Sequence, residues 1–86
     1  WIYLNGKYGF VNPQGKVVVP VIYDYVGYFS EGLAGVKLKE KWGFVNKQGQ
    51  VIIPVIYDWV GNFNEGLARV ELKGKYGIIS KTRYVS

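Results

Sequence analysis

The stretch Lys7-Tyr8-Gly9-Phe10-Val11-Asn12 recurs 34 residues later as Lys41-Trp42-Gly43-Phe44-Val45-Asn46, and again in weaker form as Lys75-Tyr76-Gly77-Ile78-Ile79-Ser80. Alignment of Lys7–Glu40 with Lys41–Gly74 gives 23 identities in 34 positions without a gap. A fixed period of this length is typical of repeat proteins, in which each unit buries its apolar face on its neighbours. The chain of 86 residues therefore divides into a partial repeat 1–6, full repeats 7–40 and 41–74, and a partial repeat 75–86.

Each full repeat is predicted to contain β-strands joined by short turns. Val, Ile, Tyr and Phe favour strands, whereas Gly, Pro and Asn mark the turns between them. A proline cannot donate a ladder hydrogen bond, so we expect Pro20 and Pro54 to end the middle strand. The predicted segments of the first copy are strand Tyr8–Asn12, turn Asn12–Gly15, strand Lys16–Val19, a short strand around Tyr23–Val26, and strand Leu33–Lys39. The second copy repeats them at Trp42–Asn46, Asn46–Gly49, Gln50–Ile53, Tyr57–Val60 and Leu67–Lys73.

The last strand of each repeat shows the clearest alternation of apolar and polar residues. Ala34, Val36 and Leu38 point to one side, and the residues between them point to the other. This period of two indicates a strand with one buried face. Trp1–Leu4 matches the same strand, and tight turns lead from each such strand into the next copy. We therefore predict an all-β fold of tandem antiparallel β-hairpins, arranged as a solenoid-like or propeller-like array of sheets.

The composition excludes several classes of site. The chain has no Cys and no His, which removes disulfides and the ligands of ordinary zinc sites. No Asp-rich loop for calcium and no glycine-rich phosphate motif is present. The acidic residues Asp24, Glu31, Asp58 and Glu65 are copied from repeat to repeat, whereas a catalytic pair is normally a single asymmetric site. We therefore expect no enzyme, no cofactor and no metal.

The net charge of +5 is not concentrated on the repeats. Each full repeat has four basic and three acidic residues, and the remaining three charges come from Lys75, Lys81 and Arg83. Nucleic acid binding calls for a denser basic patch, so we do not expect it. The longest apolar runs are about five residues, far short of the roughly 18 that span a membrane, so we expect no membrane insertion. The chain begins at Trp1 rather than Met, so we expect a processed product, an excised fragment, or a sequence deduced without its gene start.

The repeat resembles the WG-repeat family, also called KWG repeats. The resemblance rests on Lys41-Trp42-Gly43-Phe44-Val45-Asn46, Gln48-Gly49, Ile53-Pro54, Tyr57-Asp58, Phe63 and Glu65-Gly66-Leu67-Ala68, with Tyr8 in place of the signature Trp in the first copy. It implies an array of scaffold or binding modules without a shared catalytic function. It also implies an extracellular or cell-surface location in a bacterium. The signature residues that it marks as structural are Tyr8, Gly9, Trp42, Gly43, Tyr76 and Gly77.

The signature aromatics and the loop aromatics have two possible roles. Tyr8, Trp42 and Tyr76 could form a platform for sugar rings, but we favour packing in the core over the neighbouring strand. The irregular segments carry Tyr25, Tyr28 and Trp59, and loops on rigid scaffolds are where binding residues concentrate. These three are the candidate ligand-binding residues.

Trp1 and Tyr3 fall on the outward side of their strand. Bulky aromatics there are covered by another copy of the chain or by a ligand, or they belong to a crowded end of the fold. Together with Tyr84 they are the candidate assembly interface. Two functions follow from the sequence. The chain is a non-catalytic scaffold that self-assembles as a homo-oligomer or filament, or contacts other proteins; alternatively, it is a module that binds a glycan or cell-wall polymer.

Overall fold

The computed structural model describes residues 1–80, which contain ten β-strands and no helix. The strands are β1 (Ile2–Leu4), β2 (Lys7–Val11), β3 (Val17–Tyr23), β4 (Tyr25–Val26), β5 (Leu33–Leu38), β6 (Lys41–Asn46), β7 (Val51–Tyr57), β8 (Trp59–Val60), β9 (Leu67–Leu72) and β10 (Lys75–Ser80). All strand pairs are antiparallel. The all-β prediction is therefore confirmed.

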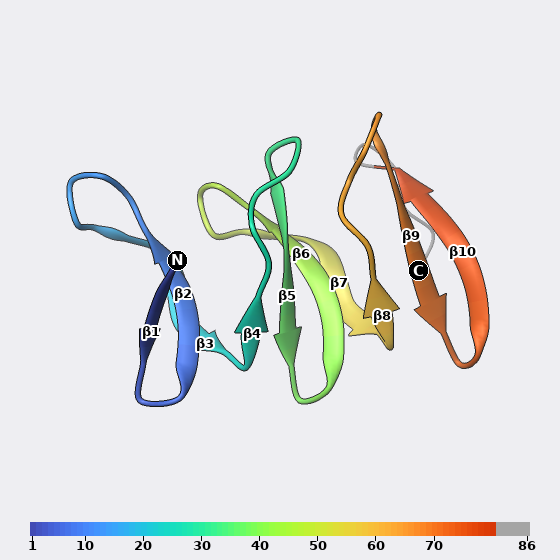
Figure 1. The fold of residues 1–86 in the computed structure, drawn as a ribbon, viewed down its shortest axis with the longest axis horizontal. Coiled ribbons are helices and arrows are strands. Elements are labelled where there is room, and N and C mark those ends of the chain that lie inside the picture. Colours follow the sequence, from blue (N-terminus) through green and yellow to red (C-terminus); the bar gives the residue numbers. More distant parts are fainter. Residues whose placement is uncertain (81–86) are drawn as a thin grey trace.

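The strands form three sheets that follow one another in a row (Figure 1). The first sheet has the order β1-β2-β3, the second β4-β5-β6-β7 and the third β8-β9-β10. The row measures 38 × 25 × 16 Å, and none of the sheets closes into a barrel. Each sheet takes its strands from two successive copies of the repeat, because β5 of the first copy pairs with β6 of the second.

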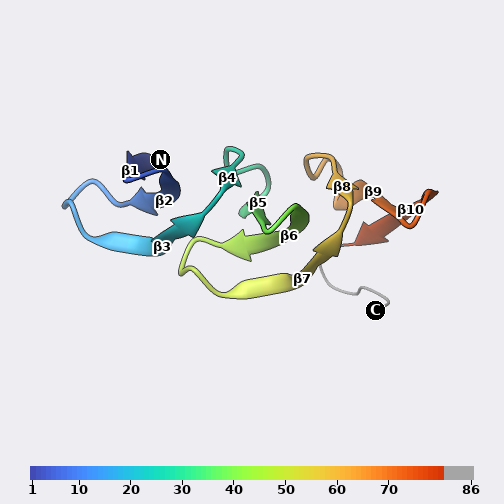
Figure 2. The ribbon, with the colours of Figure 1, turned by 90° about the horizontal axis from the view of Figure 1, so that it is seen from below.

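The chain passes from one sheet to the next at an aspartate. β3 belongs to the first sheet, and after Asp24 the chain continues as β4 on the edge of the second sheet. The same passage occurs from β7 through Asp58 to β8 in the third sheet (Figure 2). Neighbouring sheets are therefore joined by nearly continuous extended chain as well as by packing.

The expectation that Pro20 and Pro54 end the middle strand is wrong. β3 and β7 continue through these prolines. In the first sheet Phe10 pairs with Val19 and Tyr8 pairs with Tyr23, so four steps along β3 oppose two steps along β2. The extra residues form a bulge, and a bulge is one of the places where a strand tolerates proline.

The bulge explains the glycine beside the signature aromatic. A Cβ added at Gly9 would lie 2.6 Å from the carbonyl oxygen of Val19, and one added at Gly43 would lie 2.5 Å from that of Ile53. Both distances are shorter than real contacts allow, and the obstructing atoms belong to backbone. The bulged strand therefore passes so close to the signature strand that only glycine fits opposite it.

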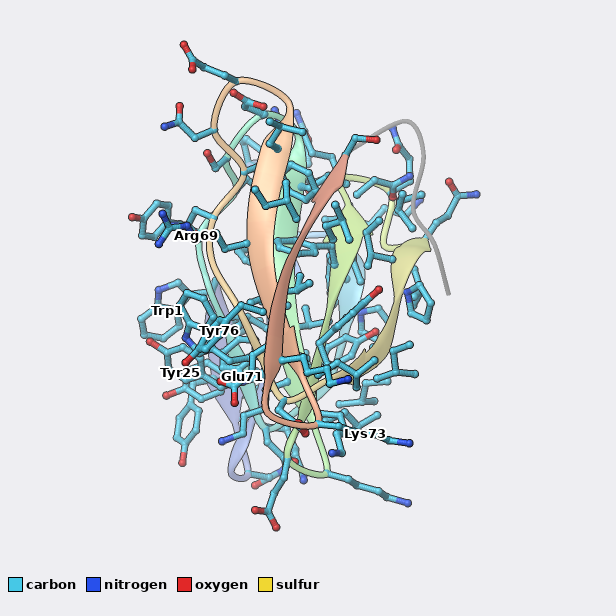
Figure 3. The ribbon with its side chains drawn as sticks, turned by 90° about the vertical axis from the view of Figure 1, so that its right-hand side faces the viewer. Trp1, Tyr25, Arg69, Glu71, Lys73 and Tyr76 are labelled. Carbon is cyan, nitrogen blue, oxygen red and sulfur yellow. The ribbon has the colours of Figure 1, made fainter. Side chains whose placement is uncertain are left out.

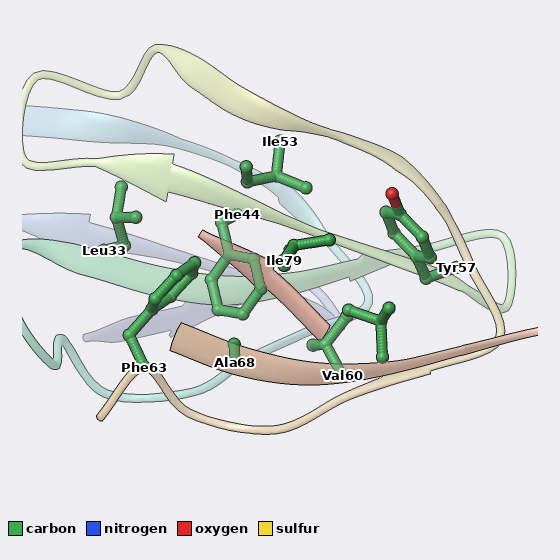
Figure 4. Close-up of a cluster of buried hydrophobic side chains, with 9 residues drawn as sticks. Leu33, Phe44, Ile53, Tyr57, Val60, Phe63, Ala68 and Ile79 are labelled. Carbon is green, nitrogen blue, oxygen red and sulfur yellow. The ribbon is translucent and has the colours of Figure 1, made fainter. Parts of the chain in front are cut away.

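Two apolar cores lie between successive sheets. The core between the first and second sheets contains Phe10, Val19, Tyr23, Val26, Ala34, Val36 and Val45. The core between the second and third sheets contains Leu33, Phe44, Ile53, Tyr57, Val60, Phe63, Ala68, Val70 and Ile79 (Figure 4). Ala34 and Val36 are buried, as the alternation along this strand predicts. Leu33 and Gly35 on the other face of β5 are buried as well, so the expectation of a single buried face is wrong for β5, which lies between the two cores. The expected alternation of buried and exposed residues is found from Leu67 to Val70 of β9.

Candidate binding surface

One long side of the array carries a row of aromatic rings. Ring centroids are 5.4 Å apart for Trp1 and Tyr8, 4.7 Å for Tyr3 and Tyr8, and 5.5 Å for Tyr8 and Tyr25. The row continues from Tyr25 to Trp42 at 5.9 Å. These separations, with the rings tilted or edge to face, are favourable arrangements for aromatic pairs. The contacts cross from the first sheet to the second.

The strand register fixes the rings on this side. Tyr3 stands opposite Tyr8 across β1 and β2, and Lys37 of β5 stands opposite both Tyr25 and Trp42. In the third sheet Glu71 of β9 stands opposite both Trp59 and Tyr76. Directly opposed residues share one face of a sheet and touch, so the same positions meet in each sheet. We call Trp1, Tyr3, Tyr8, Tyr25, Trp42, Trp59 and Tyr76 the aromatic row.

Seen along the array, the labelled residues Trp1, Tyr25, Tyr76, Arg69 and Glu71 lie on the same side, and Lys73 lies away from them (Figure 3). On the third sheet, Trp59, Arg69, Glu71 and Tyr76 line an open hollow of about 340 Å³. Aromatic walls with a few polar groups are the usual lining of small-molecule sites. This hollow combines rings with a cation and a carboxylate.

The second sheet has a different set of side chains at the equivalent positions. They are Tyr25, Gly35, Lys37 and Trp42, and the Lys37 ammonium lies 6.0 Å from the centroid of the Trp42 ring. A Cβ added at Gly35 would lie 3.7 Å from the Trp42 ring, which shows that this ring passes over the glycine. A cation at this distance from an indole face is attracted to it. In the first sheet the matching positions hold Trp1, Tyr3 and Tyr8.

The differences between the two repeats are frequent on this side. Of 34 aligned positions 23 are identical, so 34 − 23 leaves 11 that differ. Four of the 11 belong to the surface just described. They are the pairs Tyr8 and Trp42, Tyr25 and Trp59, Gly35 and Arg69, and Lys37 and Glu71. The two copies thus keep one framework and change the side chains displayed on the aromatic row.

The structure brings together residues from all three predicted groups. Tyr25 and Trp59, predicted as ligand-binding residues, lie on the aromatic row. Trp1 and Tyr3, predicted as an assembly interface, join the same row through Tyr8. Tyr84 lies outside the described residues.

The sequence favours packing of the signature aromatics in the core, but none of the three side chains is fully buried. Tyr8 and Trp42 are partly buried at the margins of the two cores. Tyr76 is 75% exposed, because no described sheet covers the outer face of the third sheet. The signature aromatics therefore contribute both to packing and to the surface.

Lys37, Arg69 and Glu71 were not predicted as binding residues. Their signal is present in the sequence, since they stand on the polar side of an alternating strand and differ between copies. What the sequence does not reveal is that the short strands β4 and β8 bring Tyr25 and Trp59 against them.

Polar contacts between the loop before β5 and the equivalent loop before β9 hold the two copies in register. Asn62 Nδ2 donates to the Tyr28 hydroxyl at 3.1 Å, and Ser30 Oγ donates to the Phe63 carbonyl oxygen at 2.7 Å. The Glu31 carboxylate accepts from the backbone N–H groups of Glu65 at 2.6 Å and Gly66 at 2.8 Å. Within residues 1–80, Tyr28 makes this loop hydrogen bond and takes no part in the ring contacts that build the row.

Each aspartate between two sheets accepts hydrogen bonds from a lysine side chain of one sheet and from a backbone N–H in a hairpin turn of the next. We call this pair of contacts an aspartate clamp. Asp24 accepts from the Lys7 ammonium at 2.6 Å and from the Lys39 backbone N–H at 2.9 Å. Asp58 does the same with Lys41 at 2.5 Å and the Lys73 N–H at 2.8 Å. These hydrogen bonds, first of all those from the lysine side chains, lower the pKa of both carboxyl groups. Each aspartate therefore caps a backbone N–H group of a hairpin turn and also forms an ion pair with a lysine.

The clamps predict that stability falls in acid. Each carboxyl group has a pKa below its ordinary value of 3.8 in the folded state, so its contribution is complete above that value. The contribution is lost as the pH falls through the lowered folded pKa. We expect the melting temperature to be level above about pH 5 and to fall below 3.8. Thermal unfolding followed by circular dichroism across this range measures it.

The matched control is the double variant Asp24→Asn with Asp58→Asn. Its melting temperature should be lower than that of the unsubstituted chain at neutral pH and should depend less on acid. An acid-dependent decrease of the same size in both proteins would contradict a role for the clamps.

Among residues 1–80 no group of three or more His, Cys, Asp or Glu side chains is placed to hold a metal ion. Within the same residues no helix is long and apolar enough to span a membrane.

Comparison with known proteins identifies the repeat. The family described as "WG containing repeat" matches the chain twice, over residues 8–42 and 42–76. The two matches meet at Trp42 and together cover both copies of the 34-residue period except for Lys7. Comparison with curated proteins and with solved structures gives no match.

Proposed function

Because the chain belongs to the family of WG containing repeats, we propose that the repeat supplies the strands and the cores, and that the function depends on the side chains exposed on the aromatic row. It is a non-catalytic binding scaffold, and the aromatic row binds a linear glycan. The observation that carries the proposal is the run of ring contacts from Trp1 and Tyr3 through Tyr8 and Tyr25 to Trp42.

The chemistry of the row suits a sugar polymer. Pyranose rings have apolar C–H faces that stack on Tyr and Trp, and hydroxyl groups that need charged or amide partners. Tyr and Trp offer an apolar body with a polar end, which matches this mixed character. Lys37, Arg69 and Glu71 stand beside the rings and can hydrogen-bond hydroxyl groups. The row therefore offers both kinds of contact that a sugar requires.

The geometry of the row favours an extended ligand over a compact one. The rings lie on strands of three sheets, and the sheets follow one another along the 38 Å axis. A ligand with repeated units can contact several sheets at once, and linked contacts add affinity through a high effective concentration. A hexasaccharide should therefore bind more tightly than a disaccharide of the same sugar.

The test is titration calorimetry with neutral hexasaccharides, cellohexaose and chitohexaose, against the unsubstituted chain and the variants Tyr25→Ala and Trp59→Ala. We expect at least one hexasaccharide to bind, and each variant to weaken binding about tenfold, equivalent to about 1.4 kcal/mol. The control is Tyr28→Ala, because Tyr28 is an exposed aromatic whose hydroxyl accepts from Asn62 in the loops, away from the row.

The outcomes separate clearly. Tyr28→Ala should bind like the unsubstituted chain, and all variants should keep their melting temperatures within a few degrees. No binding of either hexasaccharide at millimolar concentration would contradict the proposal, as would equal losses for Tyr28→Ala and Trp59→Ala.

A second candidate function is docking of another protein that carries the same repeat. Leu67 is 48% exposed and Ile78 is 65% exposed on the outer face of the third sheet. Their equivalents Leu33 and Phe44 are 6% and 0% exposed, because the third sheet covers the second. A sheet of the same kind therefore fits this face. Self-association of this sort is measured by light scattering, with Ile78→Lys as the variant that should abolish it.

A further inference from the structure

The second sheet holds the part of the aromatic row that has a described sheet on either side. β4, β5 and β6 carry Tyr25, Lys37 and Trp42, and Lys37 stands opposite both rings. One apolar core joins this sheet to the first sheet, and the other joins it to the third. Tyr25 is nevertheless 50% exposed, and Lys37 and Trp42 are partly exposed. The exposure of this group is therefore a property of the interior of the array.

The charged side chains of the row are balanced on the third sheet but not on the second. On the third sheet Arg69 and Glu71 lie two residues apart on the same face of β9, with opposite charges. The equivalent positions of the first sheet hold aromatic residues. On the second sheet they hold Gly35 and Lys37, so this sheet presents a cation without a carboxylate at either position.

Lys37 forms no ion pair within residues 1–80, and it takes part in neither of the aspartate clamps. The hydrogen bond from Lys7 is the largest of the effects that lower the pKa of Asp24, and the charge of Lys37 is the smallest. The Lys37 ammonium lies 6.0 Å from the centroid of the Trp42 ring, at the outer limit of a cation–π contact. It can therefore turn to an anion bound on the row without breaking an ion pair.

Gly35 allows the Trp42 ring to lie beside this cation. An added Cβ at Gly35 would lie 3.7 Å from two carbon atoms of the indole, so the ring lies over the glycine. Trp42 also stands directly opposite Lys37 across β5 and β6. A sugar that stacks on the indole would have its ring substituents close to the ammonium, because a lysine carries its charge on a long flexible stem.

We propose that the second sheet is a subsite for a uronic acid unit, whose pyranose ring stacks on Trp42 and Tyr25 and whose carboxylate binds the Lys37 ammonium. The inference rests on the proposed binding of a glycan to the aromatic row, and it narrows the ligand to an acidic glycan with carboxylated sugars. A lysine ammonium is a compact charge with several N–H donors, which suits a singly charged carboxylate. Hydrogen bonds between a cation and a carboxylate are stronger than those between neutral groups. An acidic glycan should therefore bind more tightly than its neutral counterpart.

The experiment compares cellohexaose with the β-1,4-linked hexamer of glucuronic acid, in which a carboxylate replaces each C6 hydroxymethyl group. Titration calorimetry at one pH and one salt concentration measures both ligands on the unsubstituted full chain and on Lys37→Gln. We expect the acidic hexamer to bind the unsubstituted chain about tenfold more tightly than cellohexaose. Lys37→Gln should bind the two ligands within about twofold of each other and should keep the affinity for cellohexaose.

Lys47→Gln is the matched control, because it removes the same charge from an exposed position in the turn between β6 and β7. In an extended strand this position is roughly 17 Å from Trp42. Lys47→Gln should keep the preference for the acidic hexamer. Equal loss of the preference in the two variants would mean that net charge alone attracts the glycan, and this result overturns the proposal.

A second readout locates the contact. In the ¹⁵N-labelled chain the signal of Lys37 Nζ should shift when the acidic hexamer is added and should stay in place with cellohexaose. Equal affinities for the two ligands, or an unchanged Lys37 signal at saturation, overturn the proposal and leave glycan binding on the row standing. If neither ligand binds at millimolar concentration, glycan binding itself is contradicted, and the uronic acid subsite is rejected with it.

Discussion

Gly43→Val is expected to destabilise the chain strongly. The new Cβ would lie 2.5 Å from the Ile53 carbonyl oxygen and 2.7 Å from that of Pro54, and neither backbone atom can rotate away. Overpacking of this kind costs about 3 kcal/mol or more. Small domains have total stabilities of about 5–15 kcal/mol, so this loss would be a large fraction of the total. Urea unfolding followed by tryptophan fluorescence measures the loss.

The chain provides a matched control for this substitution at Gly77. It is the third signature glycine, but an added Cβ would meet nothing closer than 4.0 Å. Gly77→Val should therefore leave stability unchanged or raise it slightly, since glycine weakens a strand interior. If Gly43→Val and Gly77→Val destabilise the chain equally, the proximity of the bulged strand does not explain the signature glycine.

Phe44→Ala is expected to cost about 3–5 kcal/mol of unfolding free energy. The Phe44 side chain is fully buried between the second and third sheets, and its ring centroid lies 4.7 Å from that of Phe63. Truncation would remove the apolar contact and leave a cavity that two rigid sheets cannot close. Denaturant unfolding gives the difference directly.

The third copy again supplies the control. Ile78 occupies the position equivalent to Phe44 but is 65% exposed. Ile78→Ala should change stability by no more than about 0.5 kcal/mol, as for other exposed positions. A cost at Ile78 as large as that at Phe44 would mean that the outer face of the third sheet is covered in solution.

The sequence was sufficient to predict the strands, the turns and the repeated hairpins. The period of 34 and the alternation around Val36 depend only on local pattern and burial, which a sequence displays directly. The continuation of β3 through Pro20 could not be predicted, because it depends on a register in which four steps of one strand oppose two of another. Register is a property of the pair of strands, and neither strand shows it alone.

The candidate surface was predicted only in part. Tyr25 and Trp59 stood out as aromatics in irregular segments, and Trp1 and Tyr3 stood out as aromatics on a polar side. Trp1 and Tyr3 are joined to Tyr25 only through Tyr8, whose ring contacts all three. These contacts join strands of two sheets, so they become visible only when the sheets are stacked.

The sharing of each sheet between two copies has a consequence for how such genes change length. The second sheet takes β4 and β5 from one copy and β6 and β7 from the next, so the boundary between copies lies at the β5–β6 turn within a sheet and not between two sheets. Unequal recombination that adds or removes 34 codons rebuilds the same joints wherever the crossover falls. Natural selection can therefore lengthen or shorten the array in steps of one period, and the number of displayed rings grows or shrinks in the same steps.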